Sequence, residues 1–320
     1  MKIRIFKIAV IFLFPFFCFP QGKVKEKEIV LEAKDCKIFG TLKVPASKQK
    51  VPVVLIIAGS GPTDRDGNAR SLGLKGNTYK ILSDSLNRHG IATLCYDKRG
   101  VGKSITNAQS KRDLHFEHFV EDAKAWIELL SQDKRFSEII VLGHSEGSLV
   151  GMIACQNNPK ASKFISVAGP GSPADEVIKE QLARGLSRTL REEAYWILNE
   201  LKEGNMVDTV STGLYNYGFH PENQPYMISW FKYNPQEEIA KLTLPVLILN
   251  GDLDVQVSED EAELLHEAYP NAKKVIIEDM NHVLKNSEST DMNAQWKDSY
   301  HNPNTPVNQV LVKEIVGFVK

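Results

Sequence analysis

Residues 143–147 (Gly-His-Ser-Glu-Gly) constrain the fold of this chain more than any other segment. They follow the apolar run 139–142 and precede residues 148–154, which have the composition of a helix. The pattern predicts a strand, a sharp turn and a helix in that order. The two glycines allow a tight backbone turn without a Cβ clash, and the turn places Ser145 at the positive end of the helix dipole. A serine hydroxyl is a weak nucleophile, so such a site also needs a base and a group that orients the base.

Candidates for both groups follow later in the chain. Residues 245–250 are typical of a buried strand, and Asp254 comes shortly after them. Residues 273–278 predict another strand, which is followed by His282. A side chain just beyond the carboxyl end of a strand lies where sites are built in open α/β sheets.

The order of Ser145, Asp254 and His282, each after its own strand, resembles the α/β-hydrolase superfamily, and the resemblance extends over about residues 28–320. It implies that Ser145 is the nucleophile, that His282 is the base and that Asp254 orients the histidine. Asp252 competes for the orienting role, but the family pattern favours Asp254. The other residue of the pentapeptide that could be mistaken for a base, His144, is expected to be a packed structural histidine.

The loop 59–68 (Gly-Ser-Gly-Pro-Thr-Asp-Arg-Asp-Gly-Asn) follows a predicted strand at 51–58. By position in the family, the backbone N–H groups of Ser60 and Glu146 are expected to stabilise an oxyanion. This loop and the Gly-His-Ser-Glu-Gly segment together resemble a bacterial esterase subgroup that acts on short-chain acyl esters. The sequence leaves open whether the Glu146 side chain fixes the turn or caps the helix.

A second loop, residues 97–104 (Asp-Lys-Arg-Gly-Val-Gly-Lys-Ser), follows the predicted strand 91–96 and is similar to a loop common in the same superfamily. Its glycine spacing does not fit a phosphate-binding loop. We expect Asp97 and Arg99 to form a structural ion pair near the site.

The rest of the chain alternates between strand and helix patterns, which predicts an α/β fold with a mostly parallel sheet and helices on both faces. We expect an edge hairpin at 28–34 and 37–44, and a hydrolase core formed by residues 22–171 and 240–320. Residues 172–239 contain no strand pattern and are expected to form a helical cap. Its predicted helices span 174–190, 192–203 and 209–217, and residues 281–306 look irregular before a closing helix at 307–319.

An aromatic cluster in the cap has two possible roles. Tyr226, Trp230, Phe231 and Tyr233 either close the pocket over the site or form the core of the cap itself.

Composition excludes several classes of function. The net charge is −1, so there is no electrostatic footprint for nucleic acid. No Cys/His spacing predicts a metal site, since His115 and His118 lack a third ligand, and no cofactor is expected. The oligomeric state is not determined by the sequence.

The N-terminus predicts export. Lys2, Arg4 and Lys7 precede a short apolar run at 8–19, which is typical of a signal peptide over residues 1–21. The protein is therefore expected to be periplasmic or secreted, with no stable membrane insertion after cleavage. The cleavage site itself is not fixed by the sequence.

These features predict a serine hydrolase that cleaves small acyl esters through an acyl-enzyme intermediate. An exported aminopeptidase and a thioesterase remain alternatives, and a non-catalytic binding protein on the same fold is the least favoured. The acyl and alcohol groups of the substrate are not specified.

Overall fold

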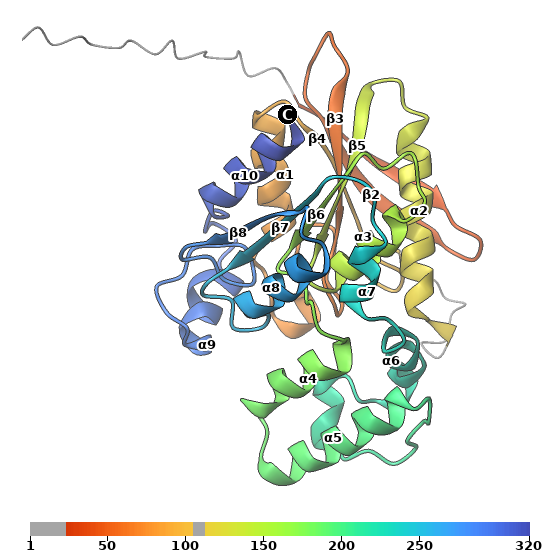
Figure 1. The fold of residues 1–320 in the computed structure, drawn as a ribbon, viewed down its shortest axis with the longest axis vertical. Coiled ribbons are helices and arrows are strands. Elements are labelled where there is room, and N and C mark those ends of the chain that lie inside the picture. The colour runs from red at the N-terminus through yellow and green to blue at the C-terminus, as the bar shows by residue number, and fades with distance from the viewer. Residues whose placement is uncertain (1–23, 105–112) are drawn as a thin grey trace, which may run out of the picture.

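The computed structural model describes residues 24–104 and 113–320, and eight strands form one sheet at its centre (Figure 1). The order across the sheet is β1-β2-β4-β3-β5-β6-β7-β8. The strands are β1 (Lys25–Glu32), β2 (Lys37–Val44), β3 (Val51–Ile57), β4 (Ala92–Tyr96), β5 (Phe136–His144), β6 (Lys163–Val167), β7 (Val246–Gly251) and β8 (Lys273–Ile277).

The sheet is mostly parallel. β1 and β2 form the antiparallel edge hairpin that was expected, and β2 also pairs antiparallel with β4. From β4 to β8 every neighbouring pair is parallel. The carboxyl ends of these strands therefore meet at one edge of the sheet, where open α/β sheets build their sites.

Helices cover both faces of the sheet, as the alternating sequence pattern predicts (Figure 1). One face packs against α1 (Thr78–Arg88) and α10 (Gln309–Val319). The other packs against α2 (Phe116–Ser131), α3 (Glu146–Cys155), α7 (Pro235–Ala240) and α8 (Glu259–Ala268).

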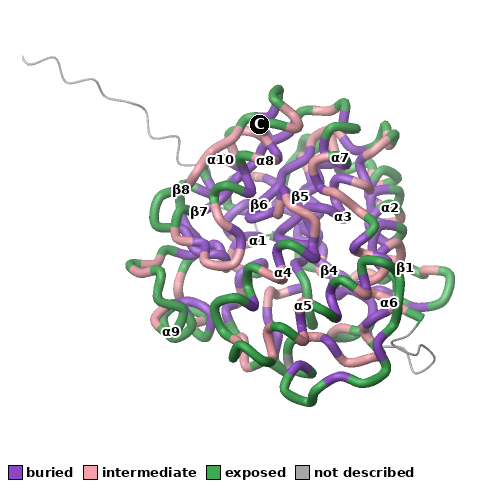
Figure 2. Tube along the Cα trace, turned by 60° about the horizontal axis from the view of Figure 1, so that its bottom comes forward, coloured by how far each residue is buried: buried purple, intermediate pink, exposed green. Residues whose placement is uncertain are grey.

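Alternating side chains of the central strands fill both cores. In β3, Val53 and Leu55 point to the α2–α3 side, whereas Val54 and Ile56 point to the α1–α10 side. All four are buried, and Figure 2 shows the interior around the sheet as buried. Burying a side chain of this kind stabilises a fold by about 1.5–3 kcal/mol, so the near-continuous apolar strands suit a sheet covered on both faces.

Residues 174–231 form a helical group at the lower end of the molecule in Figure 1, whereas α7, at the end of the predicted cap, packs against the sheet. The group contains α4 (Ala174–Ala183), α5 (Arg188–Lys202), the 3₁₀ helices η3 (Thr212–Tyr217) and η4 (Pro221–Asn223), and α6 (Gln224–Trp230). These elements share their own apolar core, to which Leu198, Leu214 and Phe219 contribute fully buried side chains. The division of the chain into a hydrolase core and a cap stays a prediction.

The predicted helix 174–190 was too long. α4 ends at Ala183, and α5 begins at Arg188 with Ser187 as its N-cap. The Ser187 hydroxyl accepts a hydrogen bond from the Leu190 N–H. The serine therefore starts a new helix where the sequence pattern suggested continuity.

The aromatic cluster joins α6 to α2. The Phe116 and Trp230 rings stack at 6.3 Å between centroids, and the Tyr233 ring lies 5.3 Å from that of Phe116. Tyr226 packs against Phe116 and Phe119. These contacts attach the helical group to the sheet-covering layer.

The segment expected to be irregular at 281–306 contains two further helical turns, α9 (Met292–Gln295) and the π-helical η5 (Trp296–Tyr300). The Asp291 carboxylate caps α9 by accepting from the Ala294 N–H, and the Trp296 ring stacks on the Tyr300 ring. The short local interactions that create these turns leave no apolar periodicity in the sequence.

Three cysteines of the described chain, Cys36, Cys95 and Cys155, are free and buried. Burial raises the pKa of the Cys36 thiol to about 11 and that of Cys95 to about 12. The predicted signal peptide, residues 1–21, lies outside the described residues. Within residues 24–104 and 113–320, every helix is too short or too polar to cross a bilayer.

Two glycine-to-alanine substitutions should change stability in opposite directions. A Cβ at Gly251, the last residue of β7, would lie 1.9 Å from the Met280 backbone oxygen, so we expect Gly251→Ala to destabilise the fold by about 3 kcal/mol through overpacking. Gly317 is exposed within α10 and a Cβ there meets nothing, so Gly317→Ala should stabilise by about 0.5 kcal/mol. Urea unfolding of both variants measures the two values, and equal effects would contradict the packing described for Gly251.

Candidate active site

Ser145 occupies a strained turn between β5 and α3. Its φ of 54° and ψ of −125° are rare for a residue with a side chain. The turn depends on close backbone contacts, because a Cβ at Gly143 would lie 2.1 Å from the Gly147 oxygen and a Cβ at Gly147 would lie 2.4 Å from the Ile57 oxygen. The Ser145 N–H donates to the Val167 carbonyl at 3.0 Å, which ties the turn to β6.

His282 and Asp254 are brought together from the ends of β8 and β7. The distance from His282 Nδ1 to Asp254 Oδ2 is 2.8 Å. The other carboxylate oxygen of Asp254 accepts from the N–H groups of Gln256 and Val257, so the carboxylate is held from both sides. Asp252, the alternative acid, is exposed and makes no hydrogen bond to His282 among those of the described residues. This geometry leaves Nε2 of His282 as the nitrogen available to Ser145.

Ser145, His282 and Ser60 line one cavity of about 110 Å³. The other lining residues are Gly59, Thr63, Gly67, Ala69, Leu74, Gly76, Thr78, Tyr79, His144, Gln256, Val283 and Tyr300. The structure therefore places the predicted nucleophile, the predicted base and one predicted oxyanion donor around the same space.

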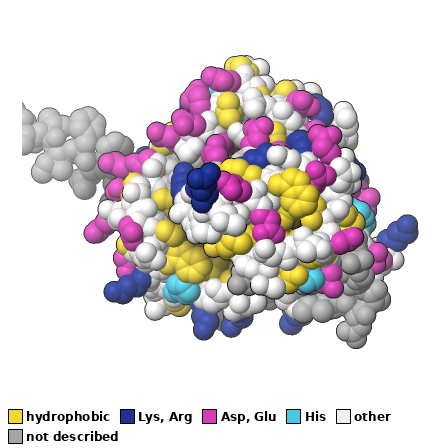
Figure 3. Space-filling model, turned by 90° about the horizontal axis from the view of Figure 1, so that it is seen from below, with side chains coloured by type: hydrophobic (Ala, Val, Ile, Leu, Met, Phe, Trp, Pro, Cys, Tyr) yellow, Lys and Arg dark blue, Asp and Glu magenta, His cyan; other side chains and the backbone are white. Residues whose placement is uncertain are grey.

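The walls of this cavity come from the segments 59–79 and 282–300, with Gln256 from the loop after β7. The segment after His282 thus forms part of the rim of this cavity. None of residues 172–239 lines the cavity, so of the two roles considered for the cap aromatics the structure does not show the closing of the pocket. Those aromatics are used in the joint between α6 and α2, and the outer face at this end of the molecule shows hydrophobic side chains in separate patches (Figure 3).

The backbone hydrogen bonds favour the N–H groups of Ser60 and Glu146 over that of Gly59 as oxyanion donors. Glu146 is the first residue of α3, so its N–H has no acceptor within that helix. The N–H of Gly59 donates to the Tyr79 hydroxyl at 2.9 Å and is therefore already used. In the turn after β3, the next backbone donor on the cavity wall is the N–H of Ser60.

A chain of buried hydrogen bonds links this loop to the base. The Tyr79 hydroxyl lies 2.8 Å from His144 Nδ1, and His144 Nε2 lies 2.8 Å from the carbonyl oxygen of His282. Because a carbonyl only accepts, Nε2 carries the proton of His144 and Nδ1 accepts from Tyr79. Burial, and next the neighbouring His282, lower the pKa of His144 to about 3. His144 is thus a neutral structural histidine, as expected, but no sequence pattern indicates its partner Tyr79.

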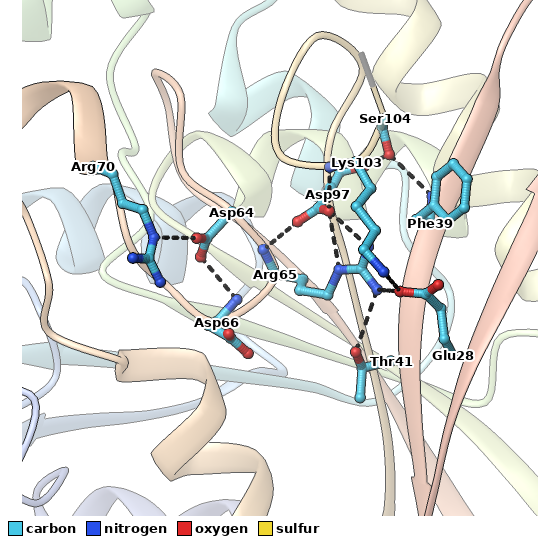
Figure 4. A network of polar contacts seen from close by, with 10 residues as sticks. All are labelled: Glu28, Phe39, Thr41, Asp64, Arg65, Asp66, Arg70, Asp97, Lys103 and Ser104. Carbon is cyan, nitrogen blue, oxygen red and sulfur yellow. Dashed lines mark hydrogen bonds and ion pairs between the residues drawn. The ribbon is translucent and has the colours of Figure 1, made fainter.

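The expected ion pair between Asp97 and Arg99 is wrong. Asp97 binds Arg65, which donates from its backbone N–H, its Nε and its Nη2 (Figure 4). Arg99 instead places two nitrogens on the two oxygens of Asp122 in α2, each at 2.7 Å. Arg99 and Asp122 form a bidentate pair, whereas the Arg65 guanidinium places two N–H groups on one oxygen of Asp97, so each residue has a charged partner on another segment.

The Arg65 network also anchors the loop 59–68 to the edge hairpin. Its guanidinium reaches Glu28, which also binds Lys103 at 2.7 Å (Figure 4). Within the loop, the Asp64 carboxylate accepts from the N–H groups of Asp66 and Asn68. The loop 59–68 is therefore fixed both by hydrogen bonds within it and by bonds to other segments.

The Glu146 side chain, whose role the sequence left open, is buried and paired. Its Oε1 lies 3.1 Å from Nζ of Lys98, and the same nitrogen donates to the carbonyl of Gly59 at 2.5 Å. Sequence reasoning missed Lys98, since nothing in its spacing indicates a partner 48 residues away.

Metal ligands are not assembled in the part of the chain that the structure describes, where no group of three or more His, Cys, Asp or Glu side chains could hold an ion. His115 and His118 lie at the start of α2 with ring centroids 5.7 Å apart, and His118 Nδ1 accepts from the His115 N–H.

Comparison with known proteins identifies the fold. A family model described as serine aminopeptidase, S33, matches residues 72–212. Esterase EstD of Thermotoga maritima is 26% identical over 305 residues, which cover 92% of this chain and 67% of the relative. Est1E of Butyrivibrio proteoclasticus, solved with ferulic acid, superposes with a TM-score of 0.61 at 18% identity and covers 91% of this chain and 97% of its own. The α/β hydrolase GrgF of a Penicillium species superposes with a TM-score of 0.60 at 15% identity, and the match covers 92% of this chain and 98% of GrgF.

This chain has the α/β-hydrolase fold. In α/β-hydrolases the nucleophile lies on a sharp strand-to-helix turn, and the acid and the histidine follow in that chain order. Ser145, Asp254 and His282 occupy these settings after β5, β7 and β8.

The two aspartates after β7 provide a direct test of the site. Asp254→Asn keeps the size of the side chain but presents an amide to His282 Nδ1, so we expect kcat to fall by about 10³- to 10⁴-fold through the wrong tautomer. Asp252→Asn is the matched control, and its exposed side chain should leave kcat within about threefold. Steady-state kinetics on one acyl ester decide the point, and the reverse ranking would remove Asp254 from the site.

Proposed function

We propose that this protein is a serine hydrolase that cleaves small carboxylic esters through an acyl-enzyme intermediate. The observation that carries the proposal is the shared cavity of Ser145 and His282, with His282 Nδ1 held 2.8 Å from Asp254. The similarity to Esterase EstD along 92% of this chain supports it.

In the first half of the reaction, Ser145 Oγ attacks the acyl carbonyl carbon and His282 Nε2 takes the hydroxyl proton. Asp254 stabilises the imidazolium that forms. The carbonyl oxygen becomes an oxyanion and accepts from the N–H groups of Ser60 and Glu146, where a single donor is worth about 10²- to 10³-fold in rate. The C–O bond to the alcohol then breaks, and His282 returns the proton to the leaving alcohol.

In the second half, His282 takes a proton from water, and the resulting hydroxide attacks the acyl carbon on Ser145. The same two N–H groups receive the oxyanion again. The bond to Ser145 breaks, the serine regains its proton from His282, and the carboxylic acid is released.

The lining of the cavity favours an uncharged substrate. No carboxylate, ammonium or guanidinium group belongs to the residues that line it. An aminopeptidase needs a carboxylate for the substrate's amino terminus, and Glu192 and Glu193 in α5 are adjacent acidic residues of the helical group. Glu192 pairs with Arg188 and Glu193 accepts from the Ser211 N–H, and neither lines the cavity.

Aminopeptidase activity is the second candidate, because the matching family model is described as a serine aminopeptidase. The cavity has the same serine and histidine in either case. The two functions differ in what the site offers to the part of the substrate beyond the scissile bond.

A panel of nitrophenyl esters of rising acyl length, with a feruloyl ester and aminoacyl arylamides beside them, separates the candidates. A cavity of about 110 Å³ has room for several water-sized groups of about 10–15 Å³ each. Each methylene that fits should lower the activation free energy behind kcat/KM by about 0.8 kcal/mol at most. Acyl chains too long for the cavity should lose this gain through overpacking. We therefore expect kcat/KM to peak at short acyl chains.

Other outcomes of the panel change the conclusion. Rising activity up to long chains would indicate a lipase-like site. Strong hydrolysis of arylamides with weak ester cleavage would favour the aminopeptidase. Ser145→Ala serves as the control that ties any activity to this cavity.

We also propose that the protein is exported. The support is the basic start and the apolar run of residues 8–19, which are typical of a signal peptide. The N-terminal sequence of the protein recovered from its native host should begin near Gln21. Recovery from the cytoplasm with Met1 retained would reject this proposal.

A further inference from the structure

Lys98 and Glu146 form a buried ion pair directly behind the proposed oxyanion site. Their side chains are 3% and 2% exposed, and Nζ of Lys98 lies 3.1 Å from Oε1 of Glu146. The same ammonium donates to the carbonyl oxygen of Gly59 at 2.5 Å. One charged nitrogen therefore connects the turn after β3 to the first residue of α3.

The bond to Gly59 has a consequence for its neighbour Ser60. The carbonyl of Gly59 and the N–H of Ser60 belong to one planar trans peptide, so they point in opposite directions. Fixing the carbonyl on Lys98 fixes the direction of the N–H. A positive donor on the carbonyl also polarises the peptide, which strengthens the N–H as a donor.

The contact between Lys98 and Glu146 involves the residue that carries the second donor. Glu146 carries the other N–H of the proposed oxyanion site, and its own side chain holds Lys98. The two donors, which come from segments 86 residues apart by their numbers (146 − 60), are thereby linked through a single ammonium group.

Aromatic side chains shield this pair from water. Nζ of Lys98 lies 5.0 Å from the centroid of the Phe119 ring. Burial, and next the Glu146 carboxylate, raise the pKa of Tyr226 well above its usual range. Electrostatic interactions are stronger in such surroundings, so the pair holds its geometry firmly.

We propose that Lys98 and Glu146 are positioning residues that set the direction and spacing of the two oxyanion donors. Neither side chain touches the substrate. The inference rests on the proposed serine hydrolase function and explains why the nucleophile turn contains a glutamate.

Stability alone does not explain such a pair. Removing two charges from water costs several kcal/mol, and replacing a buried pair by uncharged groups is often neutral or stabilising. A neighbouring pair offers a comparison, since Arg99 and Asp122 are equally buried but bond to neither donor peptide. The two pairs should therefore differ in their effect on catalysis and not in their effect on folding.

The double variant Lys98→Met/Glu146→Gln removes both charges at nearly constant volume, and Arg99→Met/Asp122→Asn is the matched control. For the first we expect a melting temperature close to that of the wild type, a kcat about 10- to 100-fold lower and KM within about threefold. A trifluoromethyl ketone, which binds Ser145 as an oxyanion, should lose affinity by the same factor as kcat/KM. The Arg99→Met/Asp122→Asn control should keep the wild-type kcat/KM and the wild-type affinity for the ketone.

A second variant keeps the test decisive if the double variant does not fold. Lys98→Arg retains the charge and the pair with Glu146, but the planar guanidinium favours the carboxylate and should lose the short bond to Gly59. We expect kcat to fall at least 10-fold in this variant as well.

Full activity in a folded Lys98→Met/Glu146→Gln or Lys98→Arg variant would overturn the inference, and so would an equal loss in the Arg99/Asp122 control. The rate at which a fluorophosphonate labels Ser145 provides a readout independent of ester cleavage. If the wild type is labelled but cleaves no ester, the proposed function fails, and slower labelling in the Lys98 variants still tests the positioning role.

Discussion

Three consecutive charged residues after β4 are buried and paired, and two of them, Asp97 and Lys98, hold together the segments that line the site. Asp97 binds Arg65 in the loop 59–68, and Lys98 binds Gly59 in the same loop and Glu146 in α3. Arg99 binds Asp122 in α2 and reaches neither of these segments. Because a buried charge without a partner is costly, none of these segments can move away without exposing or stranding a charge. Through Asp97 and Lys98, the loop after β4 thus anchors both the turn after β3 and the turn at Ser145.

The order of the elements and the chemistry of the site could be predicted from the sequence because both are encoded locally. Apolar runs of strand length and amphipathic runs of helix length alternate along the chain, and Ser145, Asp254 and His282 each follow a strand end. In a parallel sheet this rule alone brings distant residues to one edge. The structure adds the bond from His282 to Asp254 and leaves Asp252 exposed, although only one residue separates the two aspartates in the sequence.

Long-range pairing and cap geometry could not be predicted in the same way. The partners of Asp97 and Lys98 lie 32 and 48 residues away along the chain, and any basic or acidic residue would have satisfied the sequence pattern equally well. Of the two roles predicted for the cap aromatics, a share in the core of the cap is found for Phe231, Tyr226 and Trp230, but the stacking of Trp230 on Phe116 of α2 was not predicted. Hydrophobic contacts are not directional, so a sequence does not show against which surface an apolar side chain packs. That surface depends on the assembled fold. The break between α4 and α5 similarly depends on one capping bond at Ser187.

The length of the loop 59–68 also has a physical explanation. The proposed chemistry needs one backbone N–H from it, that of Ser60, yet most of its polar side chains have structural partners. Asp64 accepts from the N–H groups of Asp66 and Asn68, and the Asn68 side chain exchanges hydrogen bonds with Asn77 at the start of α1. Arg65 fastens the same loop to Asp97. A backbone donor can stabilise an oxyanion only if it does not reorient during the reaction, and a loop gains that rigidity from side-chain bonds rather than from a strand or helix. The polar residues of this loop are therefore the support of a donor that carries no side-chain signature of its own.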